Sequence, residues 1–259
     1  MNQEWLQAQW PAPPRVRALC TSRHGGSSTG VYDTLNLGTH VGDAPASVAA
    51  NRAALAQALG VRPVFLTQVH GSRLLMLDAA SADEQVADAA MTQQPGLACT
   101  VMVADCLPLL MTDRLGTRVA AVHAGWRGLA GDRGLGVLEA SCQAFGSDSL
   151  ATGPSKAADL MVWLGPCIGP SAFEVGEEVR QLFVAHDPNS ARLFLPKAPG
   201  KWLADLPGLA RQRLSALGVT RVYGNDGSPP WCTVSESSRF FSHRRDRVSG
   251  RMAACIWLA

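Results

Sequence analysis

Three residues of the types that commonly bind metal ions each lie beside an apolar run. His70 ends the run 64–69, Cys106 follows the run 97–104, and His123 ends the run 118–122. Two imidazoles and one thiolate are a ligand set that zinc accepts, and a catalytic zinc keeps its fourth position open for water or substrate. If these three side chains converge, the sequence predicts a metal-dependent enzyme.

The spacing around Cys106 and His123 predicts an antiparallel hairpin. The interrupted apolar run 97–112 is followed by a turn at 113–116 and a second run at 118–123. With the turn centred near residues 115 and 116, Pro108 faces His123, and Cys106 lies two positions further along the same face. Such diagonal neighbours are about 7–8 Å apart at Cα, close enough for both side chains to reach one ion. Because Pro108 cannot donate to a ladder, we expect a bulge or a strand end near Cys106.

Each ligand also has a plain structural interpretation. A lone cysteine such as Cys106 is among the commonest core residues, and a strand-end histidine such as His123 often has no chemical role. Both residues, however, lie beside polar groups that an ordinary core avoids, namely Asp105 and Arg127. The joint placement favours a Cys/His site, with His70 as its third member.

Composition restricts the class of protein. The chain has 259 residues, 47% hydrophobic and 17% charged, which is enough for one large domain of mixed α and β structure. The net charge of +2 without blocks of like charge indicates neither a nucleic-acid surface nor a polybasic membrane anchor. The first residues do not resemble a secretory signal, and no apolar run reaches the roughly 18 residues of a membrane helix. Seven cysteines without a Cys-X-X-Cys pair fit reduced thiols in a cytoplasm.

The remaining pattern mixes strands and helices without the strict alternation of a Rossmann fold, and no Gly-X-Gly-X-X-Gly follows a strand. Asp43 is expected to cap a helix that contains Pro45 and ends at Gly60. Further helices are predicted at 129–145, 175–185 and 203–217, and strands at 15–21, 64–69, 160–164, 219–223 and 251–258.

Several arginines suit a phosphate or carboxylate ligand. Arg23 precedes a Gly/Ser loop, Arg127 follows the ligand strand, and Arg245 belongs to an Arg-Arg pair. We predict these three as anion contacts and Asp105 as the group that handles a proton. The alternative is that the arginines around Asp246 form a solvated face. Three loop histidines, His24, His40 and His243, are further candidates for lining a pocket.

Taken in order, these segments resemble the YfiH family, whose members have been labelled polyphenol oxidases, laccase-domain proteins and purine nucleoside phosphorylases. The resemblance runs from about Arg15 to the C-terminus. It is carried by these motifs: Thr67-Gln68-Val69-His70-Gly71, Ala104-Asp105-Cys106-Leu107-Pro108, His123-Ala124-Gly125-Trp126-Arg127-Gly128, Leu164-Gly165-Pro166-Cys167-Ile168-Gly169-Pro170 with Phe173-Glu174-Val175-Gly176, and Phe241-Ser242-His243-Arg244-Arg245-Asp246 with Gly250-Arg251-Met252-Ala253.

The resemblance implies a fold and a metal site. It implies an α+β single-domain mixed β-sandwich with flanking helices, in α-β-β-α layers, over residues 15–259, preceded by an extended segment of residues 1–14. It also implies that His70, Cys106 and His123 bind zinc, with copper as an alternative.

The activities implied are phosphorolysis of adenosine, inosine, guanosine and 5′-methylthioadenosine, and deamination of adenosine. The expected partners are therefore nucleosides and phosphate, in a monomer or weak homodimer. We predict Cys106, His123, Asp105 and Arg127 as catalytic residues. Contacts to nucleoside or phosphate are predicted for Arg23, Asn36, Gln68 and Arg245.

Other functions stay open at this point. Cys106 and His123 would also suit a cysteine hydrolase that needs no metal. A copper-dependent polyphenol oxidase fits a His₂Cys set, but six histidines without a His-X-His pair are few for a multicopper enzyme. Peptidoglycan editing, or a metal-binding protein that acts through a partner, are further readings. The segments 128–137 and 225–231 look longer than is usual in the family, which affects substrate preference more than the ligands.

Overall fold

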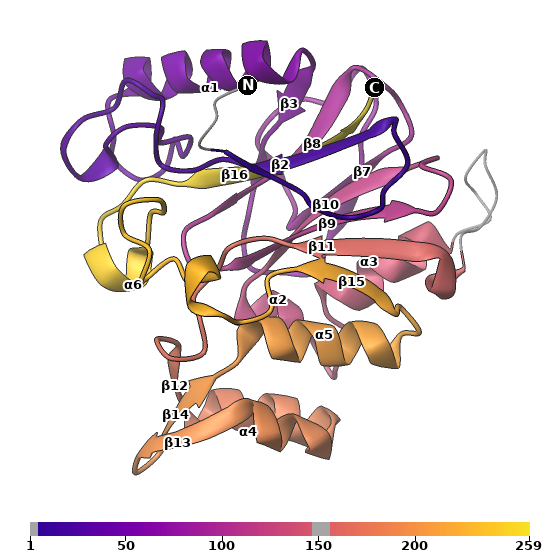
Figure 1. The fold of residues 1–259 in the computed structure, drawn as a ribbon, viewed down its shortest axis with the longest axis vertical. Helices are drawn as coiled ribbons and strands as arrows, with labels where there is room; N and C mark the ends of the chain where they lie inside the picture. Colours follow the sequence, from indigo (N-terminus) through magenta and orange to yellow (C-terminus); the bar gives the residue numbers. More distant parts are fainter. Residues whose placement is uncertain (1–4, 147–155) are drawn as a thin grey trace.

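Two β-sheets lie face to face at the centre of the fold (Figure 1), in a computed structural model that describes residues 5–146 and 156–259. The five-stranded sheet has the order β1 (Leu6–Gln7), β2 (Val16–Cys20), β16 (Met252–Leu258), β8 (Leu97–Val103) and β3 (Arg62–Val64). The six-stranded sheet has the order β15 (Arg221–Gly224), β11 (Leu160–Leu164), β9 (Leu107–Asp113), β10 (Val119–Ala124), β7 (Ala89–Thr92) and β5 (Leu74–Met76).

Helices cover the outer face of each sheet. Helix α1 (Pro45–Leu59) packs Leu55 and Leu59 on the five-stranded sheet. The other face of the six-stranded sheet packs against α2 (Trp126–Ala130), α3 (Val137–Phe145) and α5 (Leu206–Ala216). This arrangement confirms the predicted mixed sandwich with flanking helices in α-β-β-α layers.

Smaller elements complete the described structure. Beside α4 (Glu177–His186) lies a three-stranded sheet of β12 (Glu174–Gly176), β14 (Lys201–Ala204) and β13 (Phe194–Ala198). Strands β4 (Leu66–Thr67) and β6 (Gln85–Val86) form a pair, and α6 (His243–Asp246) is one short turn. The 3₁₀ helices are Gly30–Tyr32, Ala157–Asp159, Pro188–Leu193 and Pro229–Trp231.

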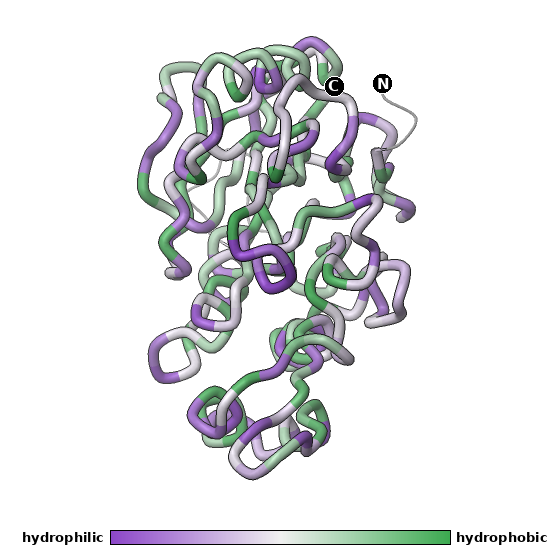
Figure 2. The backbone as a smooth tube through the Cα atoms, turned by 90° about the vertical axis from the view of Figure 1, so that its left-hand side faces the viewer, coloured by the Kyte–Doolittle hydropathy of each residue, from purple (hydrophilic) through white to green (hydrophobic). Residues whose placement is uncertain are grey.

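The central strands are apolar on both faces because each sheet is covered on both sides. Every residue of β8, β9, β10 and β16 is buried, which explains why these segments appear in the sequence as continuous apolar runs rather than alternating ones. In Figure 2, hydrophobic stretches run through the two-sheet part of the molecule, while the most hydrophilic stretches lie mainly in loops.

The predicted hairpin is confirmed in its register, since His123 pairs with Pro108 between antiparallel β10 and β9. The interruption at residues 104–106 is a connection between the two sheets and not a bulge within one strand. Strand β8 belongs to the five-stranded sheet and β9 to the six-stranded sheet, so the chain crosses from one sheet to the other at this point. Cys106 lies at the crossing, where a side chain can face the end of the sandwich.

Several element boundaries differ from the expectations. The helix predicted at 129–145 is two helices, because Gly131 and Gly134 adopt positive φ values of 68° and 79° between them. The helices expected from residues 175 and 203 begin at Glu177 and Leu206, after strands β12 and β14. The predicted strand 64–69 is divided between β3 and β4, with a loop from residue 68.

The expected cap of α1 is also wrong. Ala44 occupies the N-cap position, while Asp43 accepts hydrogen bonds from Ser28 Oγ and Asn36 Nδ2. Of the predicted extended segment 1–14, residues 1–4 lie outside the described residues, and β1 pairs with β2. No helix among the described residues is long and apolar enough to cross a membrane.

Candidate metal centre and substrate pocket

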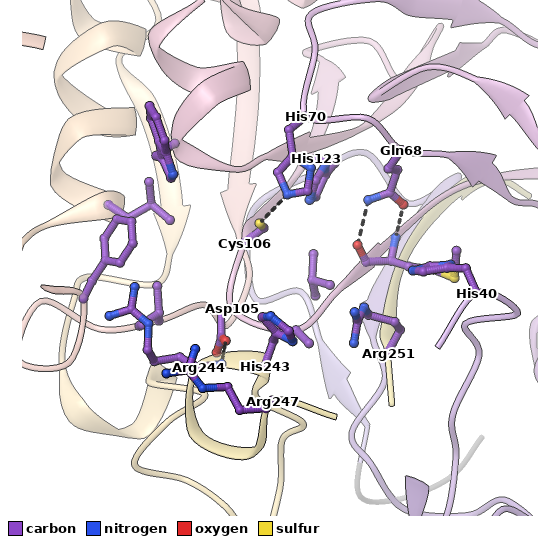
Figure 3. A pocket seen from close by; sticks show the side chains of 17 residues that line it. His40, Gln68, His70, Asp105, Cys106, His123, His243, Arg244, Arg247 and Arg251 are labelled. Carbon is purple, nitrogen blue, oxygen red and sulfur yellow. Dashed lines mark hydrogen bonds between the residues drawn. The ribbon is translucent and has the colours of Figure 1, made fainter. Parts of the chain in front are cut away.

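The three predicted ligands converge. One ligand atom from each of His70, Cys106 and His123 can be chosen so that all three lie within 4.8 Å of one another. Cys106 Sγ is 3.5 Å from His70 Nε2, and the two imidazole rings meet edge to face with centroids 4.9 Å apart. Figure 3 shows the three side chains together on one wall of a pocket. The sulfur and nitrogen donors fit a zinc or copper ion and do not fit magnesium or calcium, which prefer oxygen.

The backbone around the ligands is adapted to bring them close. His70 has a φ of +60°, a conformation that few residues other than glycine adopt. Gly125 follows His123 closely, and a Cβ there would lie 2.6 Å from His70 Cδ2 and 3.1 Å from Cys106 Sγ. Only glycine leaves room for both ligands at this position.

A buried carboxylate, Asp88, organises two of the ligands. Its Oδ1 lies 2.8 Å from His123 Nδ1, and since a carboxylate only accepts, Nδ1 carries the proton and Nε2 is left for a metal. The same carboxylate accepts hydrogen bonds from the backbone N–H groups of Val69, His70 and Gly71. Asp88 therefore sets both the tautomer of His123 and the turn that carries His70.

The site stabilises a thiolate. Burial alone would raise the pKa of Cys106 and lower that of His123, but each group stabilises the charge of the other. With further help from His70, the pKa of Cys106 falls to about 6, and with help from Asp88 the pKa of His123 rises to about 9. A thiolate beside imidazoles is ready to bind a cation at neutral pH.

This shift predicts selective alkylation of Cys106 in metal-free protein. Because its pKa is lowered to about 6, the thiolate predominates above pH 6, and its reaction with iodoacetamide should slow about tenfold per pH unit below that value. Peptide mapping across pH 4–9 would measure this rate. Cys142, whose pKa is raised to about 12 by burial and Glu139, is the internal reference. A Cys106 rate that still rises steeply above pH 8 would contradict the assignment, and added zinc should protect Cys106.

The metal centre forms part of a cavity of about 360 Å³, a size that suits a small-molecule ligand. Its lining combines apolar groups, among them Trp126, Ile168, Phe173 and Leu206, with the cations Arg244, Arg247 and Arg251. His40 and His243 also line it, as two of the three loop histidines proposed from the sequence. The third, His24, does not, and its ring bonds the carbonyl of Ser238 instead.

Besides the three ligands, the predicted residues Asp105 and Gln68 line the pocket (Figure 3), but their polar atoms bond other parts of the protein. Asp105 accepts hydrogen bonds from Thr233 Oγ1 and from the backbone N–H of Arg244, both at 2.6 Å. It thus ties the sheet crossing to α6. Gln68 donates to the carbonyl of Met102 and accepts from its N–H, so its amide extends the edge of β8.

The structure does not bring the other predicted contacts to the pocket lining. Arg23 bonds the carbonyls of Asp33 and Ser237, and Arg245 bonds those of Thr233, Val234 and Phe240. Arg127 is exposed and stacks on the Trp126 ring. Asn36 is fully buried and bonds backbone groups of Gly38 and Arg251. These placements do not favour the prediction that Arg23, Arg127 and Arg245 hold the anion, because two of these guanidinium groups bond loop carbonyls and the third is exposed.

Sequence reasoning did not single out two residues beside the ligands, Asp88 and Arg251. Asp88 was not considered, although a single carboxylate between Ala87 and the apolar run 89–91 signals a buried partner. Arg251 was noted only within a motif. Its signal is similar, a lone cation at the start of the apolar strand β16.

Comparisons with known proteins agree with this fold. The family model described as multi-copper polyphenol oxidoreductase laccase matches residues 17–259. A Pseudomonas aeruginosa protein named purine nucleoside phosphorylase is 49% identical over 255 residues, 98% of each chain. The Escherichia coli protein named purine nucleoside phosphorylase YfiH is 47% identical, over 96% of this chain and 97% of the relative.

Solved structures show the same architecture. A Neisseria meningitidis protein superposes with a TM-score of 0.88 and 44% identity over 99% of both chains. YlmD from Geobacillus stearothermophilus superposes with a TM-score of 0.87 and 30% identity, over 100% of this chain and 97% of YlmD. With a family model that covers nearly the whole chain and relatives close to half identical, the chain belongs to the YfiH family, the family described as multi-copper polyphenol oxidoreductase laccase.

Proposed function

We propose that the protein is a metal-dependent purine nucleoside phosphorylase that also deaminates adenosine. The substrates proposed are adenosine, inosine, guanosine and 5′-methylthioadenosine, together with phosphate. The observation that carries the proposal is the convergence of His70, Cys106 and His123 on the wall of a nucleoside-sized cavity. The names of the relatives from P. aeruginosa and E. coli support the same activity.

The rest of the cavity suits the parts of the substrates. A purine is a flat, largely apolar ring, and Trp126, Ile168 and Phe173 offer apolar contact to its faces. Phosphate is a dianion near neutral pH, and the arginines of the lining offer charge-assisted hydrogen bonds. In phosphorolysis a phosphate oxygen bonds to the anomeric carbon, the bond to the base breaks, and the base takes up a proton. The protein must therefore hold the anion against the sugar while excluding water.

The ligand set fits zinc, and copper as an alternative. A zinc ion held by His70, Cys106 and His123 would supply Lewis-acid polarisation of oxygen atoms. This chain's own contribution is to keep the thiolate charged, to fix His123 in one tautomer through Asp88, and to clamp the sheet crossing through Asp105. A multicopper oxidase would need more histidines than the six in this chain.

One specific observation favours a second function. Cys106, His123 and Asp88 form a thiolate, imidazole and carboxylate series, which is the arrangement of a cysteine hydrolase. Both proposals use the same atoms. They differ in whether the thiolate binds a metal ion or attacks a carbonyl.

Chelation separates the two. We expect a strong chelator to abolish phosphorolysis of adenosine and inosine by purified protein, and added zinc to restore it, because the chelator competes with the three protein donors for the ion. The assay would follow release of adenine or hypoxanthine with phosphate present, with metal analysis on the same samples. Turnover that ignores the chelator but is destroyed by alkylation of metal-free protein would favour the hydrolase.

A further inference from the structure

The pocket contains a half-buried cation, Arg251, that makes no ion pair with the described residues. Arg251 lines the cavity, and no carboxylate oxygen lies within 4 Å of its guanidinium nitrogens in the parts of the chain that the structure describes. Burial, the first cause, lowers the pKa of Arg251, and the more distant negative groups Cys106 and Asp105 offset this only in part, which reflects the cost of desolvating its charge. A charge taken out of water without a partner is costly, and a bound anion would offset that cost.

The guanidinium is oriented, and one of its edges is left for a ligand. Nη1 donates to the carbonyls of Ser249 and Gly250, at 2.8 and 3.1 Å, and to Ser249 Oγ. Within the described residues, these are all the hydrogen bonds that Arg251 makes through its side chain, so Nε and Nη2 remain as a pair of donors. Two parallel N–H groups of this kind match two oxygens of a phosphate.

His40 lies on the same side of the cavity. In Figure 3, His40 and Arg251 are on one side of Cys106, while Arg244 and Arg247 are on the other. Burial first, and then the charges of Arg251 and Arg52, lower the pKa of His40. The charge of Glu84 acts in the opposite direction but contributes less than either arginine, so His40 lies beside positive charge, which attracts anions.

One buried amide ties these two segments together. Asn36 Oδ1 accepts hydrogen bonds from the backbone N–H groups of Gly38 and Arg251, both at 2.9 Å. Gly38 also lets the Arg251 side chain pass, because a Cβ at this position would lie 2.8 Å from Arg251 Cγ. The loop that carries His40 and the start of β16 are therefore prepositioned before any ligand binds.

The cations across the cavity are less suited to this task. Arg244 donates to the carbonyl of Glu174 and lies over the Phe173 ring, while Arg247 is exposed. Gln68 lies on the same wall as Arg251, but its amide N–H and its amide oxygen both form hydrogen bonds with the backbone of Met102. Arg251 is therefore the cation that is both sheltered and able to donate.

We propose that Arg251 and His40 form the binding site for the inorganic phosphate that phosphorolysis consumes, with Asn36 and Gly38 as positioning residues. This inference rests on the proposed function for the role of phosphate as a co-substrate. The anion lies beside the metal centre, and the nucleoside lies between it and the apolar wall.

The test uses zinc-loaded full-length protein with Arg251→Gln, which keeps a polar side chain but removes the charge and the paired donors. The KM for phosphate should rise about 10- to 100-fold, the usual effect of losing a charge-assisted pair of hydrogen bonds, while the KM for inosine changes little. Arg17→Gln removes the same charge from exposed residue 17 at the far end of the sheet and should leave both values unchanged.

Gly38→Ala tests position rather than charge. It keeps every cation but pushes the Arg251 side chain, so it should also raise the KM for phosphate. Arg247→Gln is the competing variant. If it raises the phosphate KM and Arg251→Gln does not, the anion site lies on the α6 side and the proposal is wrong.

Direct binding distinguishes failure of this inference from failure of the proposed function. Calorimetry with inorganic phosphate alone should show binding to wild-type protein and at least tenfold weaker binding to Arg251→Gln. That result in a protein without phosphorolysis would uphold the site and overturn the function. Phosphorolysis with unchanged phosphate binding in Arg251→Gln, at an unchanged melting temperature, would overturn the site and uphold the function.

Discussion

Cys106→Ala is expected to lower kcat/KM for inosine phosphorolysis by at least about a thousandfold, since a bound metal ion commonly supplies several kcal/mol of transition-state stabilisation and about 4 kcal/mol corresponds to that factor. The side chain is the only thiolate of the three-ligand set. Removing it leaves two imidazoles, which hold zinc far more weakly than a set that includes a charged sulfur. The measurements are steady-state kinetics and zinc content per chain after gel filtration.

Cys142→Ala is the matched control. Cys142 is also a half-buried thiol, but it lies on α3 and does not line the pocket. We expect wild-type zinc content and turnover from this variant. Full phosphorolysis by Cys106→Ala, with a wild-type melting temperature, would remove Cys106 from the site altogether.

Asp88→Asn has the second largest expected effect, because one carboxylate serves both the metal centre and the fold. Loss of a carboxylate that orients a ligating histidine weakens metal binding about 10- to 100-fold. The amide can keep the hydrogen bonds made by only one carboxylate oxygen, so the N–H groups of Val69 and Gly71 lose their acceptor Oδ2. Two partly buried donors left without this acceptor should cost about 1–2 kcal/mol of unfolding free energy. Zinc titration with a competing chelator and thermal unfolding measure the two effects.

Asp113→Asn separates the two effects of the Asp88 variant. Asp113 is another buried carboxylate that holds a turn, at the opposite end of the β9–β10 hairpin from His123. An amide there keeps the bonds of Oδ1 to two backbone N–H groups but loses the contacts of Oδ2 with Thr117 Oγ1 and Arg118. This variant should lose stability while its zinc affinity stays within about twofold of wild type, as expected for independent sites. Wild-type zinc affinity in Asp88→Asn would mean that Asp88 serves only the fold.

The pH dependence of the Asp88 contribution has a definite sign. Burial alone would raise the pKa of Asp88, but the hydrogen bonds from His123, Gly71 and Val69 hold it below its usual value. A carboxyl whose pKa is lowered on folding stabilises the protein above its unfolded pKa of about 4, and this stabilisation is lost as pH falls through the lowered folded value. The stability difference between wild type and Asp88→Asn should therefore shrink below pH 4. Because Asp88 also helps to raise the pKa of His123 to about 9, the difference in metal-free protein should be largest near pH 5–6 and decline as the pH rises toward 9.

Much of the local structure could be predicted from the chain itself. Continuous apolar runs predict the buried strands. The turn at 113–116 predicts that Pro108 lies opposite His123, as it does in the structure. Helix ends were less predictable where glycines such as Gly131 break a pattern that is apolar throughout. Strands β12 and β14 could not be predicted, because each is a short segment that continues almost directly into a segment with a helical pattern.

The candidate ligands were also identified from residue type and spacing, because the properties that select them are local. A thiol and an imidazole remain good ligands wherever they lie, and a hairpin sets the separation of residues on its own two strands. Those two facts were enough to put Cys106 and His123 together, whereas His70 was a weaker third member until the family resemblance supported it.

Only the tertiary structure decided which charged groups join them. Arg251 reaches the pocket from just before the last strand, and Asp88, which directly precedes β7, reaches His123, 35 residues later in the chain. Arg23 and Arg245 are equally suitable anion ligands by residue type, but their guanidinium groups donate hydrogen bonds to loop carbonyls. An arginine has the same charge and the same donors in every loop. Whether it binds a ligand or its own backbone depends on which carbonyls the fold places within reach, and that is settled by contacts between segments far apart in sequence.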